Sequence, residues 1–250
     1  MLVKTEAIVL HTIKYGEQRV IVDMFTREQG RLSFIVSLPH SAHGKFRKQY
    51  FQPLTLLTIE ADVRQQVQLQ KLREISVTTP LPSLVTQPDK LSIALFMAEF
   101  LFHALRDEQQ DTALFDYVSS SIEWLDSSPR HYANFHLMFL MRLSRFLGFY
   151  PNLESRNQGL TESRSFEAPY FDLRAASFCE TAPTHRDFLM PQEAAHISTL
   201  MRMDFATMHL FQLSRAERNR ILEILLTYYR LHLPSFPELR SVEVLRELYA

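Results

Sequence analysis

The stretch EAIVLHTIKYGEQRVIVDMFTREQGRLSFIV, residues 6–36, decides the fold of the amino-terminal part of the chain. Its apolar residues recur at every second position, which is typical of β-strands. Two short polar segments separate the apolar runs, and their glycines, Gly16 and Gly30, can adopt the positive φ of a tight turn. The pattern predicts three strands joined by tight turns, at residues 6–14, 19–25 and 31–38.

Two more strands are expected further along the chain, at residues 54–61 and from residue 66 toward residue 77. Five short strands joined mostly by tight turns fit a small closed barrel of the OB type. The first strand is apolar on both faces, which suits a barrel strand that is also covered on its outside.

From about residue 89 the apolar positions recur in steps of three and four, which predicts helices. Pro80, Pro82 and Pro88 indicate a linker before them. Asp89 is expected to cap the first helix, and Ser214 is expected to form a capping box with Glu217. The expected helices lie at residues 89–105, 111–126, 130–147, from 191 onward, 214–231 and 238–249.

The segment 150–188 has no sustained period and is expected to be an irregular excursion with a short hairpin near residues 170–178. The predicted fold class is therefore α+β with two domains. Residues 1–80 form a five-stranded OB-type β-barrel, and residues 81–250 form an all-α helical bundle interrupted by this excursion.

Charge divides the chain in the same place. Residues 1–80 hold 11 Lys or Arg and 7 Asp or Glu, a net charge of +4, whereas residues 81–250 hold the remaining 16 and 21, a net charge of −5. A small basic barrel is a common carrier of nucleic acid, so the barrel is the part expected to attract DNA.

Composition argues against several other classes of protein. Five glycines leave no Gly-rich phosphate-binding loop, and the single cysteine excludes an intrachain disulfide and any multi-cysteine metal site. The most apolar segment, residues 93–102, is too short for a bilayer, which needs about 20 residues. We expect a cytoplasmic, nucleoid-associated protein without a signal peptide, a membrane segment or a cofactor.

The sequence offers weak candidates for chemistry. His131 and His136 lie five residues apart on a predicted helix and face different directions, so a solvated or partner-facing position is favoured over a metal site. His40 and His43 have no carboxylate nearby in the sequence. Cys179 lies six residues before His185, but a lone cysteine is usually structural. We expect no metal site and no catalytic residue.

The strongest physical signal is the segment HSAHGKFRKQYF, residues 40–51. Cations that neutralise phosphates are interleaved there with aromatic rings that can stack on unpaired bases. The alternative is a basic loop whose aromatic side chains only cap the barrel. The predicted DNA-binding residues of this segment are Lys45, Phe46, Arg47, Lys48 and Tyr50.

Further cations stand in or beside the first two turns and could widen the basic surface: Lys14, Arg19, Arg27 and Arg31. In the helical part, Arg142 and Arg145 flank an apolar stripe and could receive an acidic peptide that ends in an apolar anchor. The apolar stripes themselves are expected to form the core of the bundle.

Several of these segments resemble the RecO family of bacterial DNA repair proteins. Residues 6–36 are similar to the opening of that family, with an apolar strand, a short turn with Glu, a strand that ends in Phe-Thr, and a turn that ends in Gly. The segment RFLGFYPNLE, residues 145–154, resembles the family's Leu-Gly-aromatic helix end. Arg240 and Ser241, followed by Val244 and Leu245, resemble its closing helix.

The resemblance implies an OB domain and a helical domain that bind single- and double-stranded DNA and anneal complementary strands. It also implies action with RecR to load RecA onto DNA coated by the single-stranded-DNA-binding protein, whose acidic tail contacts the helical domain. Some members carry a four-cysteine zinc module in the excursion. Here at most Cys179 remains of it, so we expect no zinc.

Two other classes of function stay open at this point. The barrel could bind a protein partner instead of DNA, because OB folds serve many functions. A hydrolase or nuclease could place its site in the excursion at residues 150–188.

Overall fold

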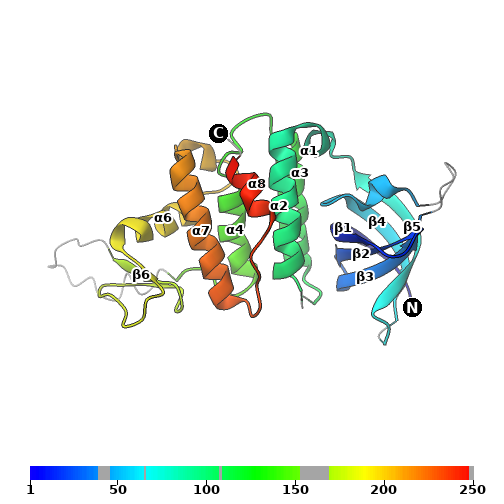
Figure 1. Ribbon diagram of the computed structural model, residues 1–250, viewed down its shortest axis with the longest axis horizontal. Coiled ribbons are helices and arrows are strands. Elements are labelled where there is room, and N and C mark those ends of the chain that lie inside the picture. The colour runs from blue at the N-terminus through cyan, green and yellow to red at the C-terminus, as the bar shows by residue number, and fades with distance from the viewer. Residues whose placement is uncertain (39–45, 65, 107–108, 153–168, 248–250) are drawn as a thin grey trace. The chain divides into compact units, whose positions relative to one another are not determined.

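The computed structural model of the protein describes residues 1–38, 46–64, 66–106, 109–152 and 169–247 (Figure 1). The chain divides into two compact units, one made of residues 1–129 and 238–250 and the other of residues 130–237. The first unit extends past residue 80, where the sequence predicts a domain boundary, because helices from residues 82–127 and the last helix share it with the barrel. That boundary stays a prediction.

The first unit contains the expected closed barrel of five strands, which run in the order β1-β2-β3-β5-β4. Strand β1 pairs antiparallel with both β2 and β4, and β3 pairs in parallel with β5, so no edge is left open. The prediction of an OB-type barrel is confirmed. The five strands are β1 (Leu2–Lys14), β2 (Arg19–Thr26), β3 (Gly30–Ser37), β4 (Leu56–Asp62) and β5 (Leu69–Thr79).

Side chains from every second position fill the barrel, among them Val9, Val22 and Phe34. The outward side chains Ile8 and Phe25 are also fully buried. Helices of the same unit cover this part of the outside, since the ring of Phe25 lies 5.8 Å from that of Phe115, between centroids. The apolar character of both faces of β1 is thereby explained.

The two turns predicted at Gly16 and Gly30 are present, and both glycines adopt a positive φ, of 74° and 66°. Two short helices were not expected from the sequence. One replaces part of the predicted linker, and one lies in the predicted basic loop. They are α1 (Pro82–Thr86) and the 3-10 helix η1 (Lys48–Phe51).

Three longer segments complete the first unit: α2 (Pro88–Ala104), α3 (Thr112–Ser127) and α8 (Ser241–Glu247). Helix α2 begins at Pro88, so Asp89 stands in its first turn and does not cap it as the sequence predicts. Lys90 is buried and its Nζ donates to the backbone oxygen of Asp126, 2.7 Å away, which ties α2 to the end of α3. Desolvation lowers the pKa of Lys90.

Helix α8 is held on α2 by one carboxylate. The side chain of Glu99 in α2 accepts hydrogen bonds from the backbone N–H groups of Arg240 and Ser241, at 3.0 and 2.8 Å. Because the first N–H groups of a helix have no partner within it, Glu99 supplies the cap for α8 from another helix.

The second unit combines helices with a small three-stranded sheet in the order β7-β6-β8. The hairpin β6–β7 and the capping box of Ser214 and Glu217 confirm two predictions. The third long helix, α4, begins at Phe135 and not near residue 130. The elements are α4 (Phe135–Phe146), β6 (Tyr170–Asp172), β7 (Ser177–Cys179), β8 (Phe188–Leu189), α6 (Pro191–Arg202), the 3-10 helix η2 (Met208–Leu210) and α7 (Arg215–His232).

The core of this unit is rich in aromatic rings. Tyr228 and Tyr229 in α7 are fully buried, and their hydroxyl groups donate to the backbone oxygens of Phe149 and Leu140. Burial raises the pKa of Tyr228 well above its usual value. Within the described parts of both units, no helix has the length and apolar character that a membrane crossing requires.

Candidate nucleic-acid interface

One end of the barrel collects four exposed cations from segments that are separate in the sequence. Arg19 pairs with Ser37 at the end of β3, and the backbone N–H of Leu38 donates to Gln18 in the β1–β2 turn, at 2.7 Å. The chain therefore leaves β3 beside that turn. We call the four side chains at this end, all solvent-exposed, the cationic end: Lys14, Arg19, Arg47 and Lys48.

The 3-10 helix η1 is fixed at the same end. Thr12 in β1 donates to the backbone oxygen of Phe51 at 2.9 Å, and Phe51 is buried in the barrel core. Lys48 is the first residue of η1, and Arg47 precedes it. Local packing thus places these two cations near the end of β1, although more than 30 residues separate them in sequence from Lys14. Lys45 lies outside the described residues, as do His40 and His43.

The aromatic side chains of this segment turn toward the barrel. Phe46 and Tyr50 are half-buried and pack against the barrel core, next to the buried Phe51. This arrangement agrees with the alternative in which the aromatic residues cap the barrel. It leaves Arg47 and Lys48 exposed and the rings of Phe46 and Tyr50 only partly so.

Arg27 and Arg31 stand beside the other turn, after β2. Strand β2 is eight residues long, so about 25 Å separates this turn from the β1–β2 turn. The guanidinium of Arg27 donates to Glu6 at 3.0 Å and to Asp116 of α3 at 3.1 Å, and these contacts raise its pKa. These arginines do not extend the cationic end.

Arg31 is largely enclosed, with 13% of its side chain exposed. Its Nη1 donates to the backbone oxygen of Phe102, its Nη2 lies 3.6 Å from Asp23, and its guanidinium stands 4.4 Å from the centroid of the Phe102 ring. It therefore links the barrel to α2 within the first unit.

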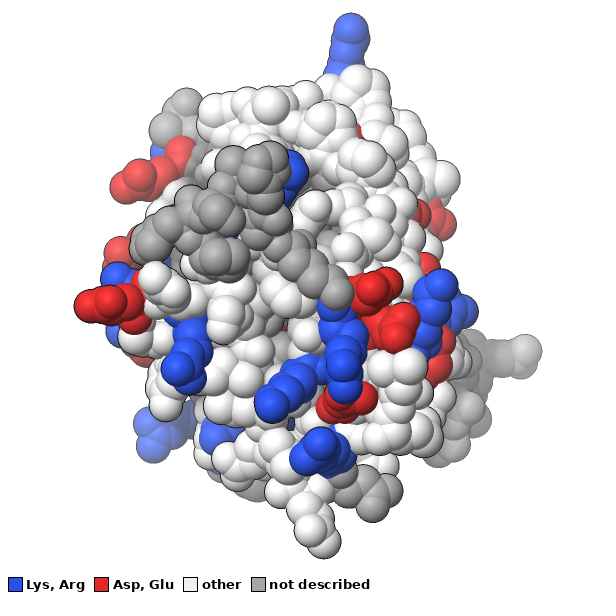
Figure 2. Space-filling model, turned by 90° about the vertical axis from the view of Figure 1, so that its right-hand side faces the viewer, with Lys and Arg blue, Asp and Glu red and all other residues white. Residues whose placement is uncertain are grey.

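The view of the barrel side shows how the charges are distributed there. Figure 2 shows basic side chains in several separate groups, with acidic side chains close beside some of them. The described surface therefore has no single unbroken basic band in this view.

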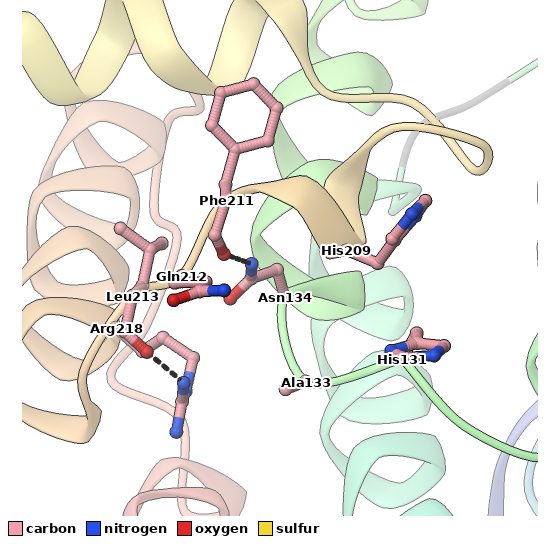
Figure 3. A pocket seen from close by; sticks show the side chains of 8 residues that line it. All are labelled: His131, Ala133, Asn134, His209, Phe211, Gln212, Leu213 and Arg218. Carbon is pink, nitrogen blue, oxygen red and sulfur yellow. Dashed lines mark hydrogen bonds between the residues drawn. The ribbon is translucent and has the colours of Figure 1, made fainter.

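The second unit contains a pocket of about 280 Å³ that no sequence motif predicts (Figure 3). Its lining residues come from three separate segments of the chain, so no repeating sequence pattern connects them. Phe211 and Leu213 supply apolar walls, and Arg218 in α7 supplies a cation. The other lining residues are His131, Ala133, Asn134, His209 and Gln212.

The polar groups of this pocket are partly satisfied. The amide nitrogen of Asn134 donates to the backbone oxygens of Phe211 and Met208, at 2.7 and 3.0 Å. Its Oδ1 is buried and has no hydrogen-bond partner among the described residues. The Arg218 Nη1 donates to the backbone oxygen of Leu213, as drawn in Figure 3. The rings of His131 and His209 lie 5.4 Å apart at the rim.

Arg142 and Arg145, the predicted partner-binding residues, do not line this pocket. The Nε of Arg142 donates to the backbone oxygen of Met203 at 3.0 Å. Arg145 is exposed and stands 4.6 Å from the centroid of the Tyr150 ring. Both side chains have local contacts, and no described feature connects them to an apolar recess.

The structure also shows where the other candidate reactive residues lie. Cys179 lies in β7, and burial raises the pKa of its thiol, which disfavours the reactive thiolate. His185 contacts Asp172, with 3.2 Å between Nε2 and Oδ2. Among the residues that the structure describes, no group of three or more His, Cys, Asp or Glu side chains could hold a metal ion.

The expectation for the position of His136 is wrong. The sequence favours a solvated or partner-facing position, but the side chain is buried in α4. Desolvation, with a smaller effect from Arg218, lowers its pKa to about 3. The imidazole is therefore neutral at physiological pH and belongs to the core.

The fold defines the chain as an OB-type barrel protein with a helical carboxy-terminal part. Comparison with known families places it more narrowly. A family model described as "Recombination protein O N terminal" matches residues 1–81, and one described as "Recombination protein O C terminal" matches residues 85–241. The chain belongs to the RecO family, whose general role is in DNA repair and recombination.

Curated relatives agree over the full length. Proteins named "DNA repair protein RecO" from Phocaeicola vulgatus and Bacteroides fragilis are 48% and 46% identical over 250 residues, covering 100% of each chain. A protein of the same name from Porphyromonas gingivalis is 35% identical over 251 residues, again with 100% coverage of both chains. The resemblance predicted from the sequence is confirmed.

Proposed function

We propose that this protein is a non-catalytic recombination mediator that binds single- and double-stranded DNA through the cationic end of its barrel. It anneals complementary strands and, together with RecR, helps to load RecA onto DNA coated by the single-stranded-DNA-binding protein. It acts at the nucleoid. The observation that carries the proposal is the gathering of four exposed cations at one barrel end in a member of the RecO family.

Phosphate neutralisation is the physical basis of this binding. Each cation that contacts a phosphate releases condensed counterions, so affinity falls as salt rises. With about four to six phosphates contacted, the logarithm of the affinity for single strands should fall with the logarithm of salt at a slope of about −3 to −4. Such contacts do not read base sequence, which suits a protein that must act on any strand.

Annealing then needs no covalent chemistry. Two strands held on one protein have a raised effective concentration, and base pairing supplies the driving force. The names of the family and of its relatives indicate DNA repair and recombination. A nuclease would be revealed by cleavage of labelled DNA in the presence of a divalent metal.

For the acidic tail of the coating protein we propose the pocket lined by Phe211, Leu213 and Arg218, in place of Arg142 and Arg145. An apolar anchor of a peptide would enter between the apolar walls, and its carboxylates would meet the guanidinium.

The test of DNA binding reverses two charges at the cationic end. In R47E/K48E we expect weaker binding of both kinds of DNA and a salt slope that is less steep by about 1.4, because two phosphate contacts are lost. R130E/R186E carries the same change of net charge at exposed positions in the second unit and serves as the control.

Gel shift and fluorescence anisotropy at several salt concentrations measure both effects, with circular dichroism as a check on folding. Unchanged affinity and slope in R47E/K48E would move the site elsewhere. Failure of the wild-type chain to shift labelled single strands at modest salt would favour the rival function, in which the barrel binds a protein partner.

A further inference from the structure

The cationic end lacks an exposed ring if Phe46 and Tyr50 cap the barrel, but the neighbouring β1–β2 turn provides one. Tyr15 is 51% exposed, and its hydroxyl group makes no hydrogen bond to a described residue. The backbone N–H of Tyr15 donates to the oxygen of Arg19 at 2.8 Å, which extends the β1–β2 ladder by one pair. Directly paired residues carry their side chains on the same face, so the phenol ring and the guanidinium are neighbours.

The same outer face continues down the barrel as an apolar surface. Ile13, two residues before Tyr15, is 43% exposed and pairs with Ile21. Ile21 pairs with Ile35, and Ile35 pairs with Lys71. Because residues two apart and residues directly paired share a face, these side chains form one surface. We call it the tyrosine ledge: Ile13, Tyr15, Arg19, Ile21, Ile35 and Lys71.

The intervening positions confirm which way the ledge faces. Val20, Val22 and Val36 belong to the barrel interior, so their neighbours Arg19, Ile21 and Ile35 point outward. The ledge is therefore an outer surface of four neighbouring strands, β1, β2, β3 and β5. Tyr15 and Arg19 lie at one end, aliphatic side chains lie in the middle, and Lys71 lies at the other end.

We propose that the tyrosine ledge is where unpaired bases of a single strand stack, with Tyr15 as the platform and with Arg19 and Lys71 on the flanking phosphates. The proposal rests on the DNA binding proposed above. It adds a contact that a single strand can make and a duplex cannot. An unpaired base has a free face for a ring, whereas a base inside a duplex is already stacked on its neighbours.

Charge favours a polyanion as the occupant. Asp23, one row below the ledge on the same face, accepts from Ser33 Oγ and lies beside Arg31 and His11. Asp62, which pairs with Lys71 across the ladder, is bound by Arg73. Glu17 is exposed at the tip of the turn, two residues after Tyr15.

The test separates stacking from charge. Y15A removes the ring, Y15F keeps the ring and removes the hydroxyl group, and V77A truncates a comparably exposed apolar side chain elsewhere on the barrel as a control. Binding is measured by anisotropy with a labelled oligothymidylate of about 16 nucleotides and with a duplex of the same length.

Loss of one stacked base should weaken single-strand binding of Y15A by about 5- to 150-fold. Y15F and V77A should bind like the wild type, the duplex affinity of Y15A should change by less than about twofold, and the salt slope should stay the same because no phosphate contact is lost. A second readout uses Y15W in a W124F background, in which single strands should quench the new indole.

Wild-type affinity of Y15A for single strands, or an equal loss for duplex and single strand, would overturn the stacking role. Absence of quenching in Y15W/W124F together with intact binding would do the same. A wild-type chain that binds no single strand at all would instead remove the proposed function, so the two failures are distinguishable.

Discussion

Burial makes His136 a source of acid sensitivity. A histidine in water titrates near pH 6.5, whereas the pKa of His136 is lowered to about 3 in the folded chain by desolvation and by Arg218. Between these two values the unfolded chain binds a proton that the folded chain does not. The free energy of unfolding must therefore fall as the pH falls through this window.

We predict that between about pH 7 and pH 5 the free energy of unfolding of the wild type falls by about 2 kcal/mol more than that of H136Q, since the glutamine does not titrate. Urea unfolding at a series of pH values measures this difference. H209Q, which changes an exposed histidine, should follow the wild type. Parallel curves for wild type and H136Q would show that the buried imidazole does not cause the acid sensitivity.

At the scale of single residues, the sequence predicts which kind of side chain stands at a position better than it predicts which groups that side chain contacts. The cations of the basic segment could be chosen from their spacing alone, and Arg47 and Lys48 are exposed as that choice requires. The partners of Arg31 could not be predicted, because Phe102 is 71 positions away in the chain. The exposure of Tyr15 could not be predicted either, because it depends on how the turn projects and not on a motif.

Arg31 acts at the scale of elements, because it joins a strand to the end of a helix. The oxygen of Phe102 is one of the last carbonyls of α2, which have no partner within the helix. A cation at this end also interacts favourably with the helix dipole. The side chain thus caps α2 and covers the Phe102 ring at the same time.

We predict that R31M lowers the free energy of unfolding by about 1.5–3 kcal/mol, the usual cost of losing a hydrogen bond to a charged group. Its DNA affinity should stay within about twofold of the wild type. R19A gives the matched contrast: its stability should change by less than about 0.5 kcal/mol, while its DNA affinity should fall. Urea unfolding and anisotropy on both variants decide the matter. Strong loss of DNA binding in R31M at unchanged stability would return Arg31 to the DNA surface.

Whole elements were predictable where a pattern repeats for long enough. The alternation over residues 6–36 gave three strands, and the capping box gave the start of α7. The short helices η1 and α1 have too few residues to show a helical period. The prolines in and beside α1 also indicated a linker instead of a helix. The cap of α8 is supplied by Glu99, so no local signal at Ser241 could reveal it.

At the scale of the whole molecule, the separation of charge suggests a separation of tasks. The basic barrel carries a net charge of +4 and the remainder −5, so a polyanion is drawn to the barrel. The pocket at Arg218 places a cation within the acidic part, and under the proposed function its apolar lining would favour a short peptide over a long polyanion. DNA binding and tail binding should therefore be separable by mutation.

The pocket variant R218Q tests that separation. A peptide that ends in acidic residues and an apolar anchor should bind it at least about tenfold more weakly than it binds the wild type, because a charge-assisted contact is lost. R145Q removes an exposed arginine outside the pocket and should bind the peptide normally.

Annealing of bare complementary strands should be unchanged in both variants. Annealing of strands covered by the coating protein should slow in R218Q alone, whereas R47E/K48E should slow both reactions. If R218Q annealed coated strands at the wild-type rate while binding the peptide weakly, the pocket would have no part in recognising the coat.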